Sequence, residues 1–158
     1  MADELGLLQV NIVSLVHLTR LLLPGMVQRG RGRIMNVAST AAFQPGPLMA
    51  NYYASKAYVL SFSQALAAEL AGTGVTVTSL CPGPVATEFQ KRAGIANSRL
   101  FAAAGLSAAA VAQIGYDATM AGKRVAIAGW KNRLLAFSTR LMPTAVLLRV
   151  VRKLNESR

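Results

Sequence analysis

Residues 32–39 read GRIMNVAS, and residues 51–56 read NYYASK. The first stretch is a short apolar run between a glycine-containing turn and a serine, the pattern of a buried strand. The second lies at the start of a long run of alanine, leucine and serine, Ala50 to Leu70, that predicts a helix. A buried strand joined to a helix through a loop of small residues is a unit from which layered α/β folds are built.

The same alternation continues on both sides of this unit. Val75–Leu80 is rich in β-branched residues and predicts a second strand, and Arg124–Ala128 predicts a third. Further helices are expected over Leu5–Leu23, over Ala108–Ala121 with Ser107 as N-cap, over parts of 87–106, and from Leu134 onward with a break at Pro143. We therefore predict one α/β domain over 1–158, a Rossmann-like doubly wound parallel sheet that is incomplete, with about three strands and flanking helices.

The first predicted helix is apolar almost all the way round, which predicts a buried helix. Asp3 suits its N-cap, and Pro24-Gly25 suits its end. Its longest apolar stretch, Leu5 to Leu18, is interrupted by four polar residues, so we predict no membrane-spanning segment.

The charge of the chain is strongly positive. Seventeen basic and six acidic residues give +11, and nine of the basic residues lie from Lys123 onward. We predict no nucleic-acid binding, because the basic residues form no continuous run and alternate with no aromatic ladder. The single Cys81 excludes an intrachain disulfide, the acidic N-terminus is unlike a secretory signal, and no metal site is predicted. These features favour a cytoplasmic protein.

Residues 130–158 form a basic, amphipathic C-terminal segment. Arg149, Arg152, Lys153 and Glu156 share one helical face, and apolar residues fill the rest. Such a helix could lie on an anionic membrane as a peripheral contact, close over a substrate pocket, or pack on a second subunit. It could equally be a docked helix with a solvated cationic face, and the pattern leaves these alternatives open.

Three side chains suggest proton-transfer chemistry. Tyr52 and Lys56 are four residues apart on the predicted helix and so share a face. A phenol with a pKa near 10 is a poor acid or base at neutral pH, and a neighbouring ammonium is expected to lower that pKa. Ser39 follows a predicted strand, at the edge where open α/β sheets bind ligands, and could hold a substrate oxygen.

With these residues the chain resembles the short-chain dehydrogenase/reductase family, and its carboxyl-terminal portion in particular. The resemblance rests on four elements in order: Val10-Asn11-Ile12, the stretch 32–39, the Tyr-x-x-x-Lys of Tyr52 and Lys56 with Ser39 thirteen residues earlier, and the turn of residues 81–87. Four elements at the right spacing form a specific signal, whereas Tyr-x-x-x-Lys alone would be weak.

The resemblance implies a role for each matching residue. Tyr52 would be the general acid/base, Lys56 would lower its pKa and bind the nicotinamide ribose, and Ser39 would orient the substrate oxygen. Asn11 would hold a water of the proton relay through a locally distorted helix. Pro82, Gly83, Val85 and Thr87 would line the nicotinamide end of the cofactor, together with Tyr52 and Lys56.

The implied activity is hydride transfer between NAD(P)(H) and a secondary alcohol or carbonyl substrate, with NAD versus NADP left undetermined. The resemblance also implies a homodimer or homotetramer, because the helices carrying Asn11 and Tyr52 commonly pack between subunits in this family.

The chain departs from the family pattern in one respect: it has no Gly-x-x-x-Gly-x-Gly turn for a pyrophosphate. We therefore expect the first mononucleotide-binding half to be missing. The alternative to an active oxidoreductase is a truncated pseudoenzyme or dimerisation module that retains the catalytic half without turnover. Without preceding strands, the strand Ile34–Ala38 is expected to form an unpaired edge that pairs with another copy or aggregates.

Overall fold

Three parallel strands form the centre of the molecule in the computed structural model, which describes residues 2–85 and 105–156. The strands are β1 (Gly32–Val37), β2 (Val75–Cys81) and β3 (Val125–Ile127), in the order β1-β2-β3. Gly32 is opposite Val75 at one end of the β1–β2 pair, and Ser79 is opposite Val125 where β3 begins. All three predicted strands are confirmed, with ends shifted by one or two residues.

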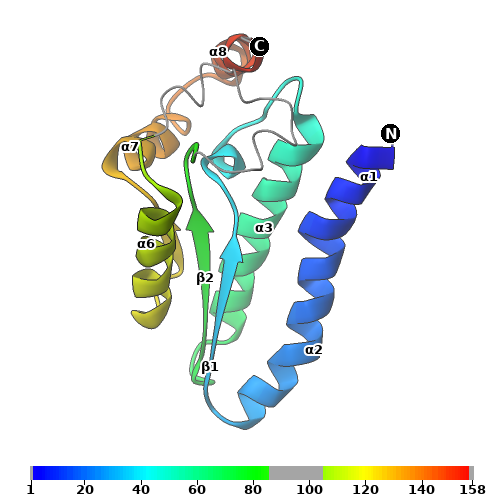
Figure 1. The fold of residues 1–158 in the computed structure, drawn as a ribbon, viewed down its shortest axis with the longest axis vertical. Helices are drawn as coiled ribbons and strands as arrows, with labels where there is room; N and C mark the ends of the chain where they lie inside the picture. Colours follow the sequence, from blue (N-terminus) through cyan, green and yellow to red (C-terminus); the bar gives the residue numbers. More distant parts are fainter. Residues whose placement is uncertain (1, 86–104, 157–158) are drawn as a thin grey trace.

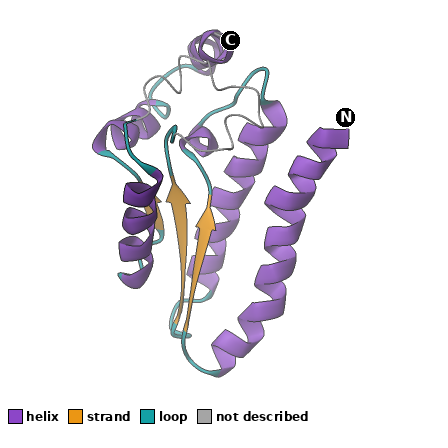
Figure 2. Cartoon of the chain, in the orientation of Figure 1, coloured by secondary structure: helices purple, strands orange, loops and turns teal. Residues whose placement is uncertain are grey.

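Helices cover both faces of this sheet (Figures 1 and 2). On one face lie α2 (Leu15–Gln28) and α3 (Ala50–Glu69), and on the other lies α6 (Ala108–Met120). The remaining elements are α1 (Ala2–Leu8), the π-helical turn η1 (Gln9–Ser14), the 3-10 turn η2 (Thr40–Phe43), α7 (Trp130–Ser138) and α8 (Thr144–Glu156). This arrangement confirms the predicted incomplete, Rossmann-like α/β fold.

The central strand β2 packs on both layers through alternate side chains, as a strand of a doubly covered sheet must. Val75, Val77 and Cys81 are buried on the side of α3, in clusters with residues such as Leu60 and Leu66. Leu80 is buried on the opposite side, against α6. The predicted cap of α6 is confirmed: the Ser107 hydroxyl accepts a hydrogen bond from the Ala110 amide at 3.2 Å.

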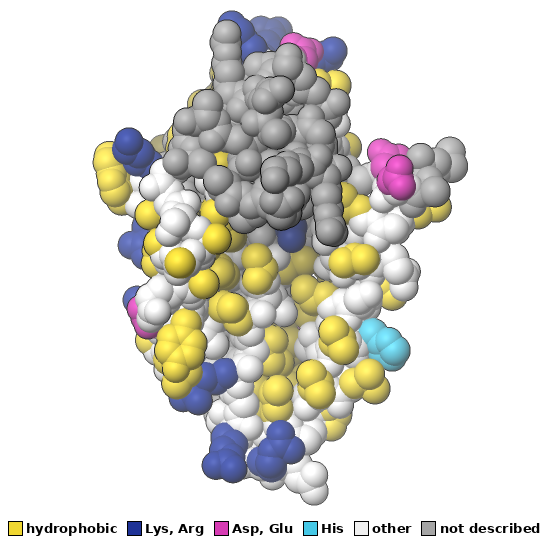
Figure 3. All heavy atoms as spheres, viewed as in Figure 1, with side chains coloured by type: hydrophobic (Ala, Val, Ile, Leu, Met, Phe, Trp, Pro, Cys, Tyr) yellow, Lys and Arg dark blue, Asp and Glu magenta, His cyan; other side chains and the backbone are white. Residues whose placement is uncertain are grey.

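The first helix is not buried as its composition predicted. Along the described part of the continuous helix of α1, η1 and α2, only Thr19 is buried, and seven of its Leu and Val side chains are exposed. Figure 3 shows hydrophobic side chains along this face of the molecule. The helix contacts α3 and β1 on one side only, which leaves the rest of its apolar surface uncovered in the single chain.

The same helix is long and apolar enough to cross a membrane, by length and composition alone, over Asp3–Gln28. The interrupted run Leu5–Leu18 did not predict this, because the polar residues within it do not lower the overall hydropathy enough. A helix whose apolar sides pack on protein has the same composition, so length and hydropathy do not distinguish the two.

The end of α2 also differs from the prediction at Pro24-Gly25. Pro24 lies inside the helix, which continues to Gln28. The chain then turns at Gly30, whose positive φ of 62° is easy for glycine. The amides of Gly30 and Arg31 bind the carbonyls of Val27 and Met26, the two bonds of a Schellman motif. This motif, rather than the proline, ends the helix. Asp3 likewise lies within α1 rather than before it.

The C-terminal helix α8 is docked on the molecule near the carboxyl ends of the strands (Figure 1). Its buried residues Leu147, Val151 and Asn155 are four apart and form one stripe. The first two pack with Ala41 and Tyr53. The cationic residues of α8 are exposed, so this helix is docked through one face and solvated on the other.

Candidate active site

The carboxyl ends of β1 and β2 bring the predicted catalytic residues together. Ser39 follows β1 by two residues, and Pro82 follows β2 directly. Tyr52 and Lys56 lie on the first turns of α3, which packs against both strands. The edge beyond the carboxyl ends of parallel strands is where open α/β sheets bind their ligands.

Tyr52 and Ser39 interact directly. Burial raises the pKa of the Tyr52 phenol, and its hydrogen bond with the Ser39 hydroxyl lowers that pKa by a smaller amount. The net direction is opposite to the expectation from the sequence, which was a pKa lowered by Lys56. The physical reason is that a phenolate loses more solvation in this packed position than its neighbours restore.

Ser39 is held in place by the turn that follows β1. Its hydroxyl accepts a hydrogen bond from the Ala41 amide at 3.1 Å, as the N-cap of η2, and lies 3.5 Å from the Pro82 carbonyl oxygen. The Thr40 amide donates to the same carbonyl at 2.8 Å. The loops after β1 and β2 are therefore tied together beside the Tyr52 phenol.

Lys56 lies close to Tyr52, one helical turn further along α3. The Nζ of Lys56 is 5.8 Å from the centroid of the Tyr52 ring and donates to the Val37 carbonyl at 3.1 Å. Burial lowers the pKa of Lys56, while interaction with the buried Cys81 thiol raises it to a lesser extent. The ammonium is thus anchored at the end of β1, one helical turn from the phenol.

Asn11 is linked to the backbone of Tyr52 through the hydroxyl of Ser55. Its amide Nδ2 donates to Ser55 Oγ at 3.0 Å, and Ser55 Oγ donates to the Tyr52 carbonyl at 2.7 Å. Asn11 lies within η1, so the helix is distorted at this residue, as the family resemblance implied. In the structure its side chain binds the helix that carries Tyr52.

The residues expected at the nicotinamide end of a cofactor lie in different surroundings. Pro82 and Gly83 lie at the loop junction, and a side chain at Gly83 would collide with Asn132, since an added Cβ would be 2.4 Å from its Nδ2. Val85 packs against the core cluster formed with α6. Thr87 lies outside the described residues.

The sequence did not reveal three residues that complete the surroundings of Tyr52. Tyr53 is buried, meets the Tyr52 ring edge-on at 5.9 Å, and donates to Asn155 Oδ1 at 3.4 Å. Asn155 Nδ2 donates in turn to the Pro47 carbonyl at 2.8 Å. The backbone of Gly46 packs against the Tyr53 ring, where an added Cβ would be 2.1 Å from the nearest ring carbon. No sequence pattern marks contacts between residues about one hundred positions apart.

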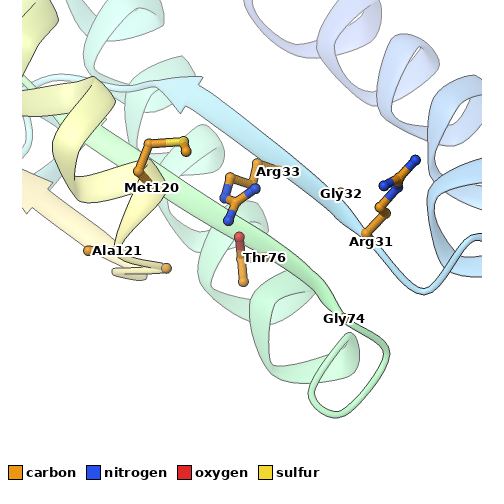
Figure 4. A pocket seen from close by; sticks show the side chains of 8 residues that line it. Arg31, Gly32, Arg33, Gly74, Thr76, Met120 and Ala121 are labelled. Atoms are coloured by element: carbon orange, nitrogen blue, oxygen red, sulfur yellow. The ribbon is translucent and has the colours of Figure 1, made fainter.

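One hollow of about 320 Å³ lies far from these residues, at the amino ends of β1 and β2 (Figure 4). Arg31, just before β1, contributes to its lining together with Arg33 of β1, Thr76 of β2 and Met120 of α6. Open α/β sheets bind ligands at the opposite edge, so this hollow does not define the site. Within the ranges 2–85 and 105–156, no three His, Cys, Asp or Glu residues lie together as metal ligands.

Comparison with known proteins agrees with this geometry. The family model for short chain dehydrogenase matches residues 4–98. Very-long-chain 3-oxoacyl-CoA reductase of Anas platyrhynchos is 45% identical over 85 residues, which are 54% of this chain and 27% of that protein. Ketoacyl reductase HetN of a Nostoc species is 41% identical over 85 residues, or 54% of this chain and 30% of that protein.

Solved structures show the same fold over most of the chain. A 7beta-hydroxysteroid dehydrogenase matches with a TM-score of 0.77 and 22% identity, over 91% of this chain and 56% of that one. A short-chain dehydrogenase from Sphingobium yanoikuyae, in complex with NADPH, matches with a TM-score of 0.71 and 28% identity, over 85% and 52%.

A third match is a 3-oxoacyl-[acyl-carrier protein] reductase from Brucella melitensis with bound NAD. Its TM-score is 0.65 and its identity 27%, over 80% of this chain and 50% of that one. The match thus spans about half the length of these solved chains, and less than a third of the two curated relatives. With the family model matched over more than half of its residues and the Ser39–Tyr52–Lys56 cluster assembled in the structure, the chain belongs to the short-chain dehydrogenase family.

Proposed function

We propose that this chain carries the catalytic half of an NAD(P)-dependent oxidoreductase that interconverts a carbonyl and a secondary alcohol. One observation supports this function above the others: the partly buried phenol of Tyr52 is hydrogen-bonded to Ser39 and lies within a turn of the Lys56 ammonium at the carboxyl edge of the sheet. Such a set can hold a carbonyl oxygen and deliver a proton to it.

The raised pKa of Tyr52 keeps the phenol in the protonated form that reduction of a carbonyl requires. Because burial disfavours the phenolate, the phenol is protonated at neutral pH and can act as the acid. The Ser39 hydroxyl orients the substrate oxygen, the Tyr52 O–H bond breaks, and its proton becomes the hydroxyl proton of the alcohol. Lys56 stabilises the phenolate that remains, and Asn11 holds the Tyr52 turn through Ser55.

The residues present fit one end of a nicotinamide cofactor. An ammonium has three donors, and the bond from Lys56 to the Val37 carbonyl uses one, so the same group can bind ribose hydroxyls. When bound, the cofactor supplies or accepts the hydride. The sequence contains no Gly-x-x-x-Gly-x-Gly turn for the pyrophosphate, so this chain by itself is expected to bind a dinucleotide weakly.

For the substrate we propose a 3-oxoacyl thioester. Two of the relatives are called a 3-oxoacyl-CoA reductase and a ketoacyl reductase, and a third match is a 3-oxoacyl-[acyl-carrier protein] reductase. Tyr52 belongs to an apolar cluster that also includes Met49 and Met142, and such surroundings suit an acyl chain better than a polar substrate.

A second candidate is a pairing module without turnover. The observation in its favour is the exposed apolar surface of the first helix together with the edge strand β1, which pairs only with β2 among the described strands. A second copy of the chain could cover both surfaces. The homodimer or homotetramer implied by the family resemblance would use this side of the molecule.

Titration with NADH and NADPH by calorimetry, followed by turnover of a 3-oxoacyl thioester, separates the two candidates. Saturable binding and loss of NAD(P)H absorbance that Tyr52→Phe abolishes would support the oxidoreductase. If no saturable binding occurs below about 1 mM, the usual upper range for enzyme substrates, autonomous catalysis is excluded for this chain. A stable dimer without cofactor binding would then support the pairing module.

A further inference from the structure

Helix α7 exposes its large apolar side chains to solvent instead of burying them. The side chains facing the body of the protein are Asn132, Ala136 and Thr139, which are small or polar. Asn132 Nδ2 donates to the Ala128 carbonyl at 2.6 Å, which fixes this inner face against the end of β3. The large apolar side chains must therefore point in the other direction.

The opposite face carries what we name the outer stripe: Trp130, Leu134 and Phe137, with Leu141 just beyond the helix. Trp130, Leu134 and Phe137 are spaced by four and three residues, so at 3.6 residues per turn they form a narrow line along one side of the helix. The four side chains of the outer stripe are 71%, 61%, 58% and 74% exposed. An uncovered line of large apolar side chains of this kind marks an interaction surface.

Basic residues border the outer stripe on both sides. Helical spacing places Arg133 on one border, and Lys131 on the other with the exposed Leu135 beyond it. Arg140 follows two residues after the end of α7, and all three basic residues are exposed. Lys131 Nζ lies 5.8 Å from the Trp130 ring centroid, and Arg133 Nε also donates to the Ile127 carbonyl at 3.3 Å. In Figure 3, hydrophobic and basic side chains lie together at the edge where Figure 1 places α7.

The charge of the whole segment identifies the partner. Between 130 and 156 the sequence has six basic residues and one acidic residue, Glu156, which is ion-paired with Arg152 at 2.6 Å. A second copy would present the same cations to this face and repel it, whereas a surface of phosphates complements it. An apolar line flanked by cations is the pattern of a helix that lies in the plane of an anionic lipid surface.

We infer that α7 docks this protein on an anionic membrane, with the outer stripe inserted among the lipids and Lys131, Arg133 and Arg140 bound to headgroup phosphates. The docking uses no residue of the candidate active site and holds for either proposed function. It also differs from a membrane span, since the helix lies along the surface.

Trp130 is the single tryptophan of the chain, so its fluorescence reports on the outer stripe directly. The 158-residue chain is titrated with vesicles of phosphatidylcholine alone and of phosphatidylcholine with phosphatidylserine. We expect a blue-shifted emission with the anionic vesicles only, and we expect added salt to reverse it because exposed charge interactions are screened. Absence of the shift, or an equal, salt-insensitive shift with both vesicles, would overturn the inference.

Two variants test the two components separately. Leu134→Gln with Phe137→Gln should weaken partitioning at least tenfold, and Lys131→Glu with Arg140→Glu should remove the preference for anionic vesicles. The matched control replaces two exposed residues four apart on α6, Tyr116→Gln with Met120→Gln, and should leave partitioning unchanged.

Circular dichroism checks that each variant is folded, and light scattering measures its mass. Unchanged partitioning of the Leu134/Phe137 variant would contradict the proposed insertion. A lower oligomeric mass of that variant would assign the outer stripe to contacts between copies and would equally overturn the inference.

Discussion

At the scale of single residues, Tyr52 is defined by two opposing effects on its phenol. Burial favours the protonated form, and the Ser39 hydroxyl favours the phenolate. Tyr53, which contacts it edge-on, also has a raised pKa, mainly through burial. The phenols of Tyr52 and Tyr53 therefore remain protonated to a higher pH in the folded chain than in the unfolded chain.

Replacing Ser39 by alanine should raise the pKa of Tyr52 further, because the hydrogen bond that lowers it is lost. Tyrosinate absorbance followed over an alkaline titration measures this as a later transition. Ser138→Ala, which removes a hydroxyl that donates to the Leu135 carbonyl within α7, is the control. An unchanged or earlier transition in Ser39→Ala would contradict the assigned contact.

The same shifts predict how folding stability depends on pH. Above pH 10.0, the ordinary tyrosine pKa, the unfolded chain loses phenolic protons that the folded chain keeps, so stability falls as pH rises. Lys56 acts oppositely: its lowered pKa makes stability rise with pH until its ordinary value of 10.5. Urea midpoints above pH 10.5 should therefore decline, and less steeply in Tyr52→Phe. An equal slope in both proteins would contradict burial of this phenol.

Gly46 and Gly6 form a matched pair of glycines. Gly46→Ala places a methyl group against the Tyr53 ring and should destabilise the fold by about 1–3 kcal/mol. Gly6→Ala, in α1 with nothing within 4 Å of the new Cβ, should stabilise it by about 0.5–1 kcal/mol. Thermal unfolding of both variants checks the contrast. A Gly46→Ala protein as stable as the unchanged protein would contradict the packing of Gly46 against the Tyr53 ring.

At the scale of elements, α8 is held by one stripe. Leu147 and Val151 pack beside Tyr53, and Asn155 binds both the Tyr53 hydroxyl and the Pro47 carbonyl. This helix thus fixes the loop before α3 and the ring next to Tyr52. Of the alternatives that its sequence left open, a docked helix with a solvated cationic face is the one supported by these contacts.

Truncating Leu147 to alanine should destabilise the protein by about 2–5 kcal/mol, because a buried leucine leaves a cavity. Val146→Ala, next to it on the exposed side, should change stability by no more than about 0.5 kcal/mol. Chemical denaturation gives both values. Similar small effects for the two substitutions would show that α8 is not docked in solution.

At the scale of the whole molecule, two adjoining surfaces remain uncovered: the edge of β1 and the outer side of the first helix. Met35 and Val37 are exposed on that edge, and Leu18 and Leu22 on that helix. An open strand edge beside apolar helix surface favours association.

We expect light scattering to give a mass larger than the 16.7 kDa of one chain. Leu18→Gln with Leu22→Gln should reduce that mass, and Tyr116→Gln with Met120→Gln, on α6, should not. A monodisperse monomer at high concentration would contradict this expectation.

The sequence alone determined the order and type of the elements near the site. The stretch 32–39 contains a strand that ends in a loop of small residues. The spacing of Tyr52 and Lys56 places both side chains on one helical face. These are local properties of periodicity and capping, so a linear pattern can carry them. The family resemblance follows from the same short motifs, and it extended to Asn11 in a distorted helix.

Only the tertiary structure decided how these residues are solvated and held. The pKa of Tyr52 depends on how much water the surrounding loops exclude. The hydrogen bond from the Tyr53 hydroxyl to Asn155 joins residues 102 positions apart. The first helix looked buried because apolar composition does not say which neighbours are present to cover it. Burial and long-range contact are properties of the packed chain, because they depend on which surfaces meet in space.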